Sequence, residues 1–294
     1  MENQGISISS SHDLAKFRDV DFQGFFCYHK SLLKESRRRR CSLRHRSLGV
    51  RRGKEVRPEK RELIYEGRTK KLYQTDRPEL IVQEFSDDAV LLDGKKKAKI
   101  KNKGALNNQV SSHLFEYLEG YHIPTHFVQQ LSDCEMLVKR LEIIPLEVVI
   151  RNVAAGSLTT QYGMKEGLDL PHPILEHYMK SDHLPPPLLN EYHILVMGLA
   201  TPEEIKLVNR IATKVNVVLR SFFERRNLKL LDFALEFGRH RGKILLGDEI
   251  SPDTCRLWDS RTNKKLDADH FRQDSDSMRE AYEEIRNRVF TKVA

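Results

Sequence analysis

The stretch "LKLLDFALEFGRHRGKILLGDEISPDTCRLWD", residues 228–259, indicates how the chain folds around its polar residues. In "LDFALEF", Asp232, Ala234 and Glu236 fall on one face of a strand, and the opposite face is aromatic and aliphatic. "RHRG" then predicts a tight hairpin turn into a second strand, "KILL". The hairpin would bring Asp248 beside Glu236, with Gly247 supplying a bulge that re-aims the aspartate.

Two carboxylates this close repel each other and are costly to bury unless a cation lies between them. Mg²⁺ suits such a place because it takes one or two carboxylates together with substrate phosphates. We therefore predict that Glu236 and Asp248 hold Mg²⁺. A surface hairpin with incidental acids is the alternative from spacing alone. The neighbouring Glu249 and Asp259 are interpreted as ordinary loop acids.

Composition limits the class of protein. The chain has 294 residues, of which 39% are hydrophobic, enough for one large domain or two small ones. No run of about 18 apolar residues predicts a membrane span, and no long apolar N-terminal segment predicts secretion. The four cysteines are scattered without a C-x-x-C pair, which argues against a disulfide framework or structural zinc and favours a reducing cytoplasm.

The basic charge is concentrated at the N-terminus. Residues 1–60 hold 15 of the 50 Lys and Arg and 7 of the 42 Asp and Glu, so the remaining body carries 35 of each sign. Because the first 60 residues show almost no apolar periodicity, we expect a disordered basic extension there. A targeting peptide or an RNA-binding arm is the alternative. The neutral body, residues 61–294, gives no electrostatic case for nucleic-acid binding.

The body is predicted to form two lobes, about 61–145 and about 146–294. The first lobe is rich in strands and has one clear helix, which ends at Gly120. Its strands, and the one that opens the second lobe, are expected at 62–75 with a turn at Gly67, at 80–85, at 136–141 and at 146–151. Pro145 is expected to separate the last two of these strands.

The second lobe contains the clearest helix, "TPEEIKLVNRIATKVNVVLRSFFERRN" (201–227). Thr201 and Glu204 form a capping box, with Pro202 at the first helical position. The apolar residues of this helix recur at helical spacing, so we assign them to the core. A closing amphipathic helix is predicted at 275–290.

Two further stretches have the composition of phosphate sites. In "YEGRTKKLY" (65–73), a glycine turn flanked by cations can cover a triphosphate, although a basic hairpin tip is usually only solvated. In "IRNVAAGSL" (150–158), Arg151 ends a strand and Ser157 begins a helix, which suits a phosphate monoester. Ser157 as an ordinary N-cap is the equal alternative. Arg256 is either a local ion-pair partner or a second phosphate ligand.

Together these segments resemble the SAICAR synthetase family of purine biosynthesis. The resemblance runs from about Arg61 to the C-terminus and is carried by "YEGRTKKLY", "KGALNN", "IPTHFV", "PLEVVIRNVAAGSL", "LDFALEFG" and "LGDEISPDTCRLWD". It implies an α+β, two-lobed fold related to ATP-grasp enzymes, with a kinase-like N-terminal lobe. It also implies ATP-dependent ligation of a carboxylated aminoimidazole ribotide (CAIR) to L-aspartate, giving SAICAR, ADP and phosphate.

The resemblance implies roles for individual residues as well. The loop over the ATP phosphates would be formed by Gly67, Arg68, Thr69 and Lys70. The nucleotide pocket would be lined by Lys139, Glu142 and Ile143. The catalytic acids would be Asp232, Glu236 and Asp248, of which the last two hold Mg²⁺. The ribotide phosphate would be bound by Arg151, Ser157 and Arg256, and the substrate region completed by Asp253. CAIR and L-aspartate are the implied small-molecule partners, and the family resemblance is compatible with a homo-oligomer.

The chain departs from the family pattern at two positions. Family members usually have Lys where Ala234 stands, and Asp where Pro186 stands in the loop 183–193. A cation beside the metal would help to bind an anionic substrate. A variant with reduced activity, or another ATP-dependent phosphotransferase on this scaffold, is therefore the alternative function. A nucleic-acid-binding protein acting through residues 34–60 is the third hypothesis, and it predicts steeply salt-dependent binding.

Overall fold

The structure is a computed structural model that describes residues 58–91, 96–180, 186–266 and 275–292. These residues belong to one compact unit, Val56–Ala294, whereas a second unit, Met1–Glu55, lies outside them. The predicted basic extension therefore falls almost wholly outside the described residues. No helix within the described ranges is both long and apolar enough to cross a membrane.

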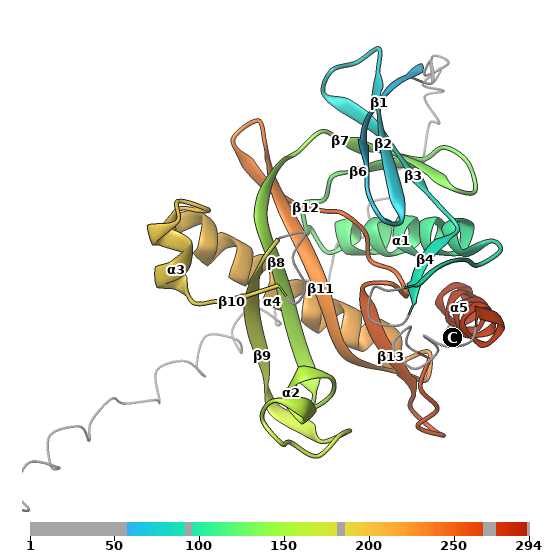
Figure 1. Ribbon diagram of the computed structural model, residues 1–294, viewed down its shortest axis with the longest axis vertical. Helices are drawn as coiled ribbons and strands as arrows, with labels where there is room; N and C mark the ends of the chain where they lie inside the picture. Colours follow the sequence, from blue (N-terminus) through green and yellow to red (C-terminus); the bar gives the residue numbers. More distant parts are fainter. Residues whose placement is uncertain (1–57, 92–95, 181–185, 267–274, 293–294) are drawn as a thin grey trace, which may run out of the picture. The chain divides into compact units, whose positions relative to one another are not determined.

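An antiparallel five-stranded sheet is built from the first part of the unit (Figure 1). Its spatial order is β1-β2-β3-β7-β6. The strands are β1 (Lys60–Glu66), β2 (Lys70–Thr75), β3 (Leu80–Phe85), β6 (Phe127–Gln130) and β7 (Glu135–Lys139). The predicted strands at 62–75, 80–85 and 136–141 are thus confirmed, although β7 ends two residues early. A separate pair of strands follows β3, namely β4 (Asp88–Leu91) and β5 (Lys96–Lys99).

The second sheet has six strands, in the order β10-β9-β8-β11-β12, with β13 also paired to β11. They are β8 (Glu142–Val153), β9 (Asp169–Met179), β10 (Leu188–Leu189), β11 (Leu228–His240), β12 (Lys243–Gly247) and β13 (Cys255–Asp259). The tight turn predicted between β11 and β12 is confirmed. Its central residues, Arg241 and Gly242, have φ of 48° and 73°, as a two-residue hairpin turn requires.

The predicted break at Pro145 is wrong, because β8 continues through it. The pairing of β8 with β11 shifts register between Glu236 and Gly238, where Glu147 and Ile143 are their respective partners. Pro145 lies inside this irregularity. A proline is tolerated there because the ladder does not need its missing N–H.

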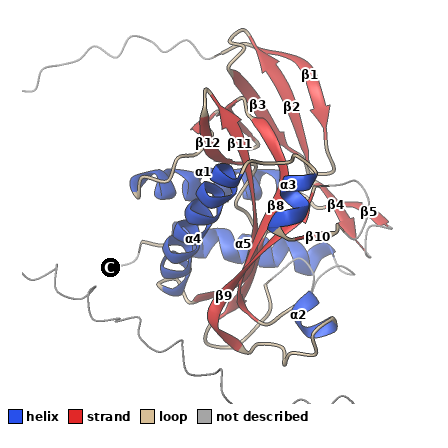
Figure 2. Ribbon diagram, turned by 90° about the vertical axis from the view of Figure 1, so that its left-hand side faces the viewer, coloured by secondary structure: helices blue, strands red, loops and turns tan. Residues whose placement is uncertain are grey.

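Helices cover the second sheet and join the two sheets (Figures 1 and 2). The helices are α1 (Lys103–Gly120), α2 (Ser157–Thr160), α3 (Glu191–Val196), α4 (Pro202–Glu224) and α5 (Ser275–Phe290). Helix α4 packs on β11, where Phe233, Leu235 and Phe237 enter one core with Leu219 and Phe222 of the helix. Helix α1 packs against α5. The predicted core stripe of α4 and the closing helix are both confirmed.

Helix α1 buries a polar face that binds loops of both sheets. The side-chain amide of Asn108 donates to the carbonyls of Ser132, Asp133 and Glu135, at 2.9 to 3.3 Å, which fixes the turn between β6 and β7. One turn further along, the hydroxyl of Ser111 accepts a hydrogen bond from the backbone N–H of Ile250 at 3.1 Å. The loop after β12 is therefore held by the same helix.

The two sheets are also joined directly through the backbone. The N–H of His126 donates to the carbonyl of Leu246 at 2.9 Å, and the N–H of Leu246 donates to the carbonyl of Pro124 at 3.0 Å. These bonds attach the segment before β6 to β12. The end of β12, where the predicted metal ligand lies, is thereby fixed relative to the first sheet.

The capping box of α4 should contribute measurably to stability. The hydroxyl of Thr201 accepts from the N–H of Glu204, whose carboxylate accepts from the N–H of Thr201. We expect Thr201→Ala to lower the free energy of unfolding by about 1 kcal/mol in denaturant titrations. Thr213→Ala, in the middle of the same helix, is the control and should cost less because alanine favours helix interiors. Equal costs would contradict a role for the cap.

Candidate active site

The predicted site residues lie in three rows across one face of the second sheet. In the first row, Asp232 of β11 is paired with Arg151 of β8 on one side and with Arg256 of β13 on the other. In the second row, Ala234 is paired with Val149. In the third row, Glu236 is paired with Glu147 and with Gly247. Residues two apart share a face of a strand, and directly paired residues share a face of the sheet, so all three rows point the same way.

Asp248 lies beside Glu236 as predicted, but by a different local structure. Gly247 stays in the ladder, and Asp248 itself adopts a positive φ of 58°. Aspartate is among the residues that tolerate this left-handed region. Its backbone carbonyl accepts a hydrogen bond from Gln83 of β3 at 3.1 Å. The expected bulge at Gly247 is therefore wrong, and a strained residue held by the first sheet aims the carboxylate.

The acids of the third row perturb one another. Burial raises the pKa of Glu236 to about 7, and the negative charge of Asp248 adds to that effect. Burial, followed by the same aspartate, also raises the pKa of Glu147. Burial favours a higher pKa for Asp248, but attraction to Lys70, the hydrogen bond from Lys70 and the charges of Lys180 and His126 together lower the pKa. Opposite shifts in neighbouring carboxyl groups are typical of functional sites.

Two lysines neutralise the acids Glu147, Glu236 and Asp248, which are called the acidic row below. The Nζ of Lys70, at the start of β2, contacts the Oδ1 of Asp248. The Nζ of Lys180, just after β9, lies 2.6 Å from the Oε2 of Glu236. Lys180 is 44% exposed at its side chain, whereas Lys70 is 15% exposed, so Lys180 can move away more easily. Each acid of the predicted pair therefore has its own cation.

The donor set fits a magnesium ion only if substrate supplies further ligands. Within the described ranges, no three His, Cys, Asp or Glu side chains are grouped so that they could hold a metal by themselves. The neighbouring carboxylates of Glu236 and Asp248 provide the one or two hard oxygen ligands that Mg²⁺ usually takes from protein. Phosphate and water oxygens complete such a site in proteins that bind metal–nucleotide complexes.

At the other end of the face, Asp232 joins the two predicted phosphate-binding arginines. Its Oδ2 lies 2.6 Å from Arg256 and 3.3 Å from Arg151. Arg151 is 7% exposed and also binds Glu176 at 2.6 Å and the hydroxyl of Tyr178 at 3.3 Å. A guanidinium with this many partners is held in one orientation.

Ser157 is not the N-cap of α2, so that alternative is wrong. The N-cap is Gly156, which has a φ of 54°, and Ser157 is the first helical residue. The Oγ of Ser157 is buried and has no hydrogen-bond partner within the described part of the chain. A side chain on Gly156 would meet Arg256, since a Cβ there would lie 3.0 Å from Nη1 of that arginine. Gly156 therefore lets Arg256 approach the start of α2.

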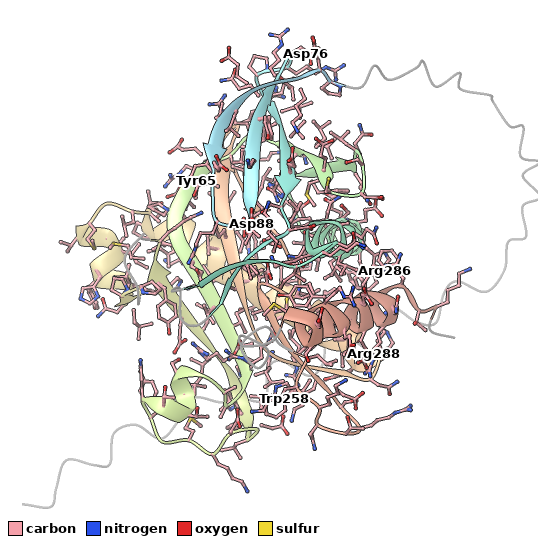
Figure 3. All side chains as sticks on the ribbon, turned by 45° about the vertical axis from the view of Figure 1, so that its right-hand side comes forward. Tyr65, Asp76, Asp88, Trp258, Arg286 and Arg288 are labelled. Carbon is pink, nitrogen blue, oxygen red and sulfur yellow. The ribbon has the colours of Figure 1, made fainter. Side chains whose placement is uncertain are left out.

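The predicted nucleotide residues are only partly brought together. The turn Gly67–Thr69 leads into Lys70, which contacts Asp248. Figure 3 shows Tyr65 at the end of β1 that enters this turn, and Asp76 at the opposite end of the hairpin. The ammonium of Lys139 donates to the carbonyl of Thr125 at 2.9 Å. Of these predicted nucleotide residues, all within the described ranges, Lys70 is the one with an ion pair to the acidic row.

Two residues of the predicted pocket follow Lys139 at the start of β8. The carboxylate of Glu142 is 75% exposed at its side chain and lies 2.9 Å from Arg239. Ile143 is 40% exposed. Arg239 also binds Glu204 at 2.5 Å, so Glu142 is joined to the N-terminus of α4 rather than to the acidic row.

Three acids between the end of β12 and the end of β13 are structural partners in this arrangement. Asp253 contacts Lys103, accepts from Asn107 at 2.8 Å, and accepts from the hydroxyl of Tyr282 at 2.5 Å. Glu249 and Asp259 are not ordinary loop acids, because both are buried. Glu249 lies 2.8 Å from Lys70. Asp259 lies 2.5 Å from Arg288 of α5, which is labelled in Figure 3.

Sequence reasoning missed several residues of this site. Glu147 could have been found, because Glu147, Val149 and Arg151 alternate along the predicted strand exactly as a shared face requires. Lys180 and Gln83 carried no such signal. They reach the acidic row only through the pairing of distant strands, which local spacing does not encode.

The chain is similar to known proteins over most of its length. The family model for SAICAR synthetase matches residues 63–289. The phosphoribosylaminoimidazole-succinocarboxamide synthase of Chloroherpeton thalassium is 57% identical over 227 residues, which cover 77% of this chain and 97% of that protein. The synthase of the same name from Chlorobium chlorochromatii is 54% identical over 230 residues, 78% of this chain and 98% of that protein.

Solved structures show the same fold. The synthase from Ehrlichia chaffeensis has 41% sequence identity and a TM-score of 0.75, covering 78% of this chain and 98% of that one. A SAICAR synthetase in complex with ADP has 45% identity and a TM-score of 0.74, covering 79% and 99%. The described unit is therefore the mixed α/β fold of a nucleotide-using ligase.

The chain belongs to the SAICAR synthetase family. The function of this family is the ATP-dependent ligation of CAIR and aspartate in purine biosynthesis, and the chain is an enzyme of that class. The resemblance first seen in six short stretches is thus confirmed over most of the body.

Replacing Glu236 should change stability in a pH-dependent way. Its pKa is raised from 4.5 to about 7, so its stabilising contribution is full below pH 4.5 and is lost as pH rises through 7. In metal-free buffer, Glu236→Gln should match the wild type near pH 4.5 and exceed it at pH 8 by up to about 3 kcal/mol of unfolding free energy. Glu166→Gln, at an exposed ion pair with Lys265, is the control and should show no such trend. Equal stabilities of Glu236→Gln and wild type at pH 8 would contradict the raised pKa.

Proposed function

We propose that CAIR lies along the three rows, with its phosphate at the first row and its carboxylate at the third. L-Aspartate is the second substrate, and ATP–Mg²⁺ binds at the acidic row. The observation that carries this assignment is the separation of two unlike clusters on one face. Two arginines lie at one end, together with the Ser157 hydroxyl, which has no hydrogen-bond partner among the residues that the structure describes. Neighbouring carboxylates lie at the other end.

The spacing suits a ribotide. Asp232 and Glu236 are four residues apart on β11, which corresponds to about 13 Å along the strand. An extended nucleoside monophosphate with a carboxylate on its base spans such a face. Its phosphate would reach Arg256 and Ser157, and its ring would lie over the small surface of Ala234 and Val149. The reacting carboxylate would then lie beside the third row.

The chemistry follows from the charges at that row. A carboxylate does not react with an amine until it carries a leaving group, and ATP can supply one by forming an acyl phosphate. Lys70 and the turn Gly67–Thr69 would hold the ATP phosphates, and Glu236 and Asp248 would hold Mg²⁺, which neutralises phosphate charge. The amine of aspartate would then attack the acyl carbon and expel phosphate. Orienting both reactants and neutralising charge are the contributions we assign to the protein.

Ala234 lies in the second row, in the middle of this face, and not at the arginine end or the acidic end. Ala234 is paired with Val149. The family resemblance leads us to expect a lysine in place of Ala234. In this chain the ammonium of Lys180 reaches Glu236 from the segment after β9. We propose that Lys180 supplies the cation for the anionic substrate. Ala234→Lys, tested by complementation of a purine auxotroph that lacks this step, should therefore give no gain in growth.

We regard the first sheet as a kinase-like lobe and the whole as related to ATP-grasp enzymes, with a lobe boundary near residue 145. Scattered cysteines and the family's role in purine synthesis favour the cytoplasm. The N-terminal extension is proposed to be dispensable for the reaction.

Ser157→Ala should separate substrate binding from stability. Its hydroxyl has no protein partner within the described ranges, so its removal should leave the unfolding temperature unchanged. If it binds the ribotide phosphate, the KM for CAIR should rise about tenfold, as expected for a lost hydrogen bond to a charged group. Thr159→Ala, in the same helix, is the matched control for the KM. An unchanged KM for CAIR in Ser157→Ala would remove Ser157 from the phosphate site.

Glu236→Ala tests the function itself. The wild-type protein should consume ATP only when both CAIR and aspartate are present, and this variant should abolish that consumption. Coupled measurement of ADP release, with each substrate omitted in turn, checks the expectation. ATP consumption by the wild type that does not depend on aspartate would overturn the proposed reaction.

A further inference from the structure

Glu249 is a buried carboxylate to which the proposed reaction gives no part. It follows Asp248 directly and is 3% exposed. Its Oε1 lies 2.8 Å from the Nζ of Lys70, and its Oε2 accepts a hydrogen bond from the hydroxyl of Ser251. A buried carboxylate is costly unless it is paired and hydrogen-bonded. Both of its oxygens are engaged, so its orientation is fixed.

Lys70 therefore contacts two carboxylates at once. Its ammonium touches Oδ1 of Asp248 as well as Oε1 of Glu249. With its side chain only 15% exposed, Lys70 depends on these partners rather than on water. If Asp248 bound a metal ion, its contact with Lys70 would be weaker. The contact between Lys70 and Glu249 can persist, because the other oxygen of Glu249 accepts a hydrogen bond from Ser251 and Glu249 is not one of the two proposed metal ligands.

We propose that Glu249 is a positioning residue that holds the ammonium of Lys70 at the nucleotide phosphates when Asp248 binds the metal. This role rests on the proposed function. Without Glu249, Lys70 would follow Asp248 and compete with the metal, or it would turn toward solvent. In either case the nucleotide loses a pre-oriented cation.

The role predicts a metal-dependent effect on nucleotide binding. In the absence of Mg²⁺, Asp248 still holds Lys70, so Glu249→Gln should weaken ADP binding less than twofold. With Mg²⁺ present, the same variant should weaken ADP binding about tenfold, the size expected for a misplaced charged hydrogen bond. Isothermal titration calorimetry of the full chain with ADP, with and without Mg²⁺, measures both values.

A double-mutant cycle shows whether Glu249 acts through Lys70. In a Lys70→Met background, Glu249→Gln should cause no further loss of ADP affinity with Mg²⁺ present. Ser251→Ala removes the hydrogen bond to Oε2 but keeps the charge, and it should give a smaller loss with the same dependence on Mg²⁺. If Glu249→Gln does not fold, Ser251→Ala is measured in its place. Glu166→Gln is the control and should leave ADP affinity unchanged.

The outcomes separate this role from the proposed function. Equal losses of affinity with and without Mg²⁺, or a full loss that persists in the Lys70→Met background, would show a purely structural role for Glu249 and overturn the inference. The reaction itself is checked on the wild type, by its need for CAIR and aspartate. If the wild type needs both CAIR and aspartate but the loss of ADP affinity in Glu249→Gln does not depend on Mg²⁺, the role of Glu249 is overturned and the proposed reaction is not.

Discussion

The antiparallel pairing of β11 with β8 is the constraint on which the site depends. It sets Asp232 opposite Arg151 and Glu236 opposite Glu147, so one register produces both the arginine end and the acidic end. Phe233, Leu235 and Phe237 alternate with these residues along β11 and enter the core against α4, and their burial fixes which face the charged residues occupy. The hydrophobic effect thereby orients polar groups that could not hold this arrangement by their own interactions.

Charge balance explains why these acids can remain close. Glu236 and Asp248 each meet a lysine from a different part of the chain, and Asp232 lies between two arginines. Lys70 comes from the first sheet, while the acids belong to the second. The ion pair therefore also fixes the glycine turn before β2 relative to the acidic row, so the proposed phosphate loop and the joining of the two sheets depend on the same contact.

Much of this could be predicted from the sequence, because period-two alternation in β11 and helical spacing in α4 are strong local signals. The proximity of Glu236 and Asp248 followed from a short hairpin. Lys180, Gln83 and the buried environment of Glu249 could not be predicted, since they arise from contacts between segments far apart in the chain. The predicted strand break at Pro145 was wrong for a related reason. The register irregularity there is a property of two paired strands, and it removes the need for an N–H at Pro145.

The parity of β11 has an evolutionary consequence. Because side chains alternate strictly along a strand, inserting or deleting one residue between Phe233 and Phe237 would reverse the faces of all residues on one side of the change. Glu236 would then point toward α4, or Asp232 would, and a core ring would point toward the site. A change of length in this segment therefore disrupts both the core and the site, whereas a substitution leaves the facing of every other side chain unchanged. Related chains are free to differ in length only where no such alternation must be kept, as in the connections that lead into and out of the sheet.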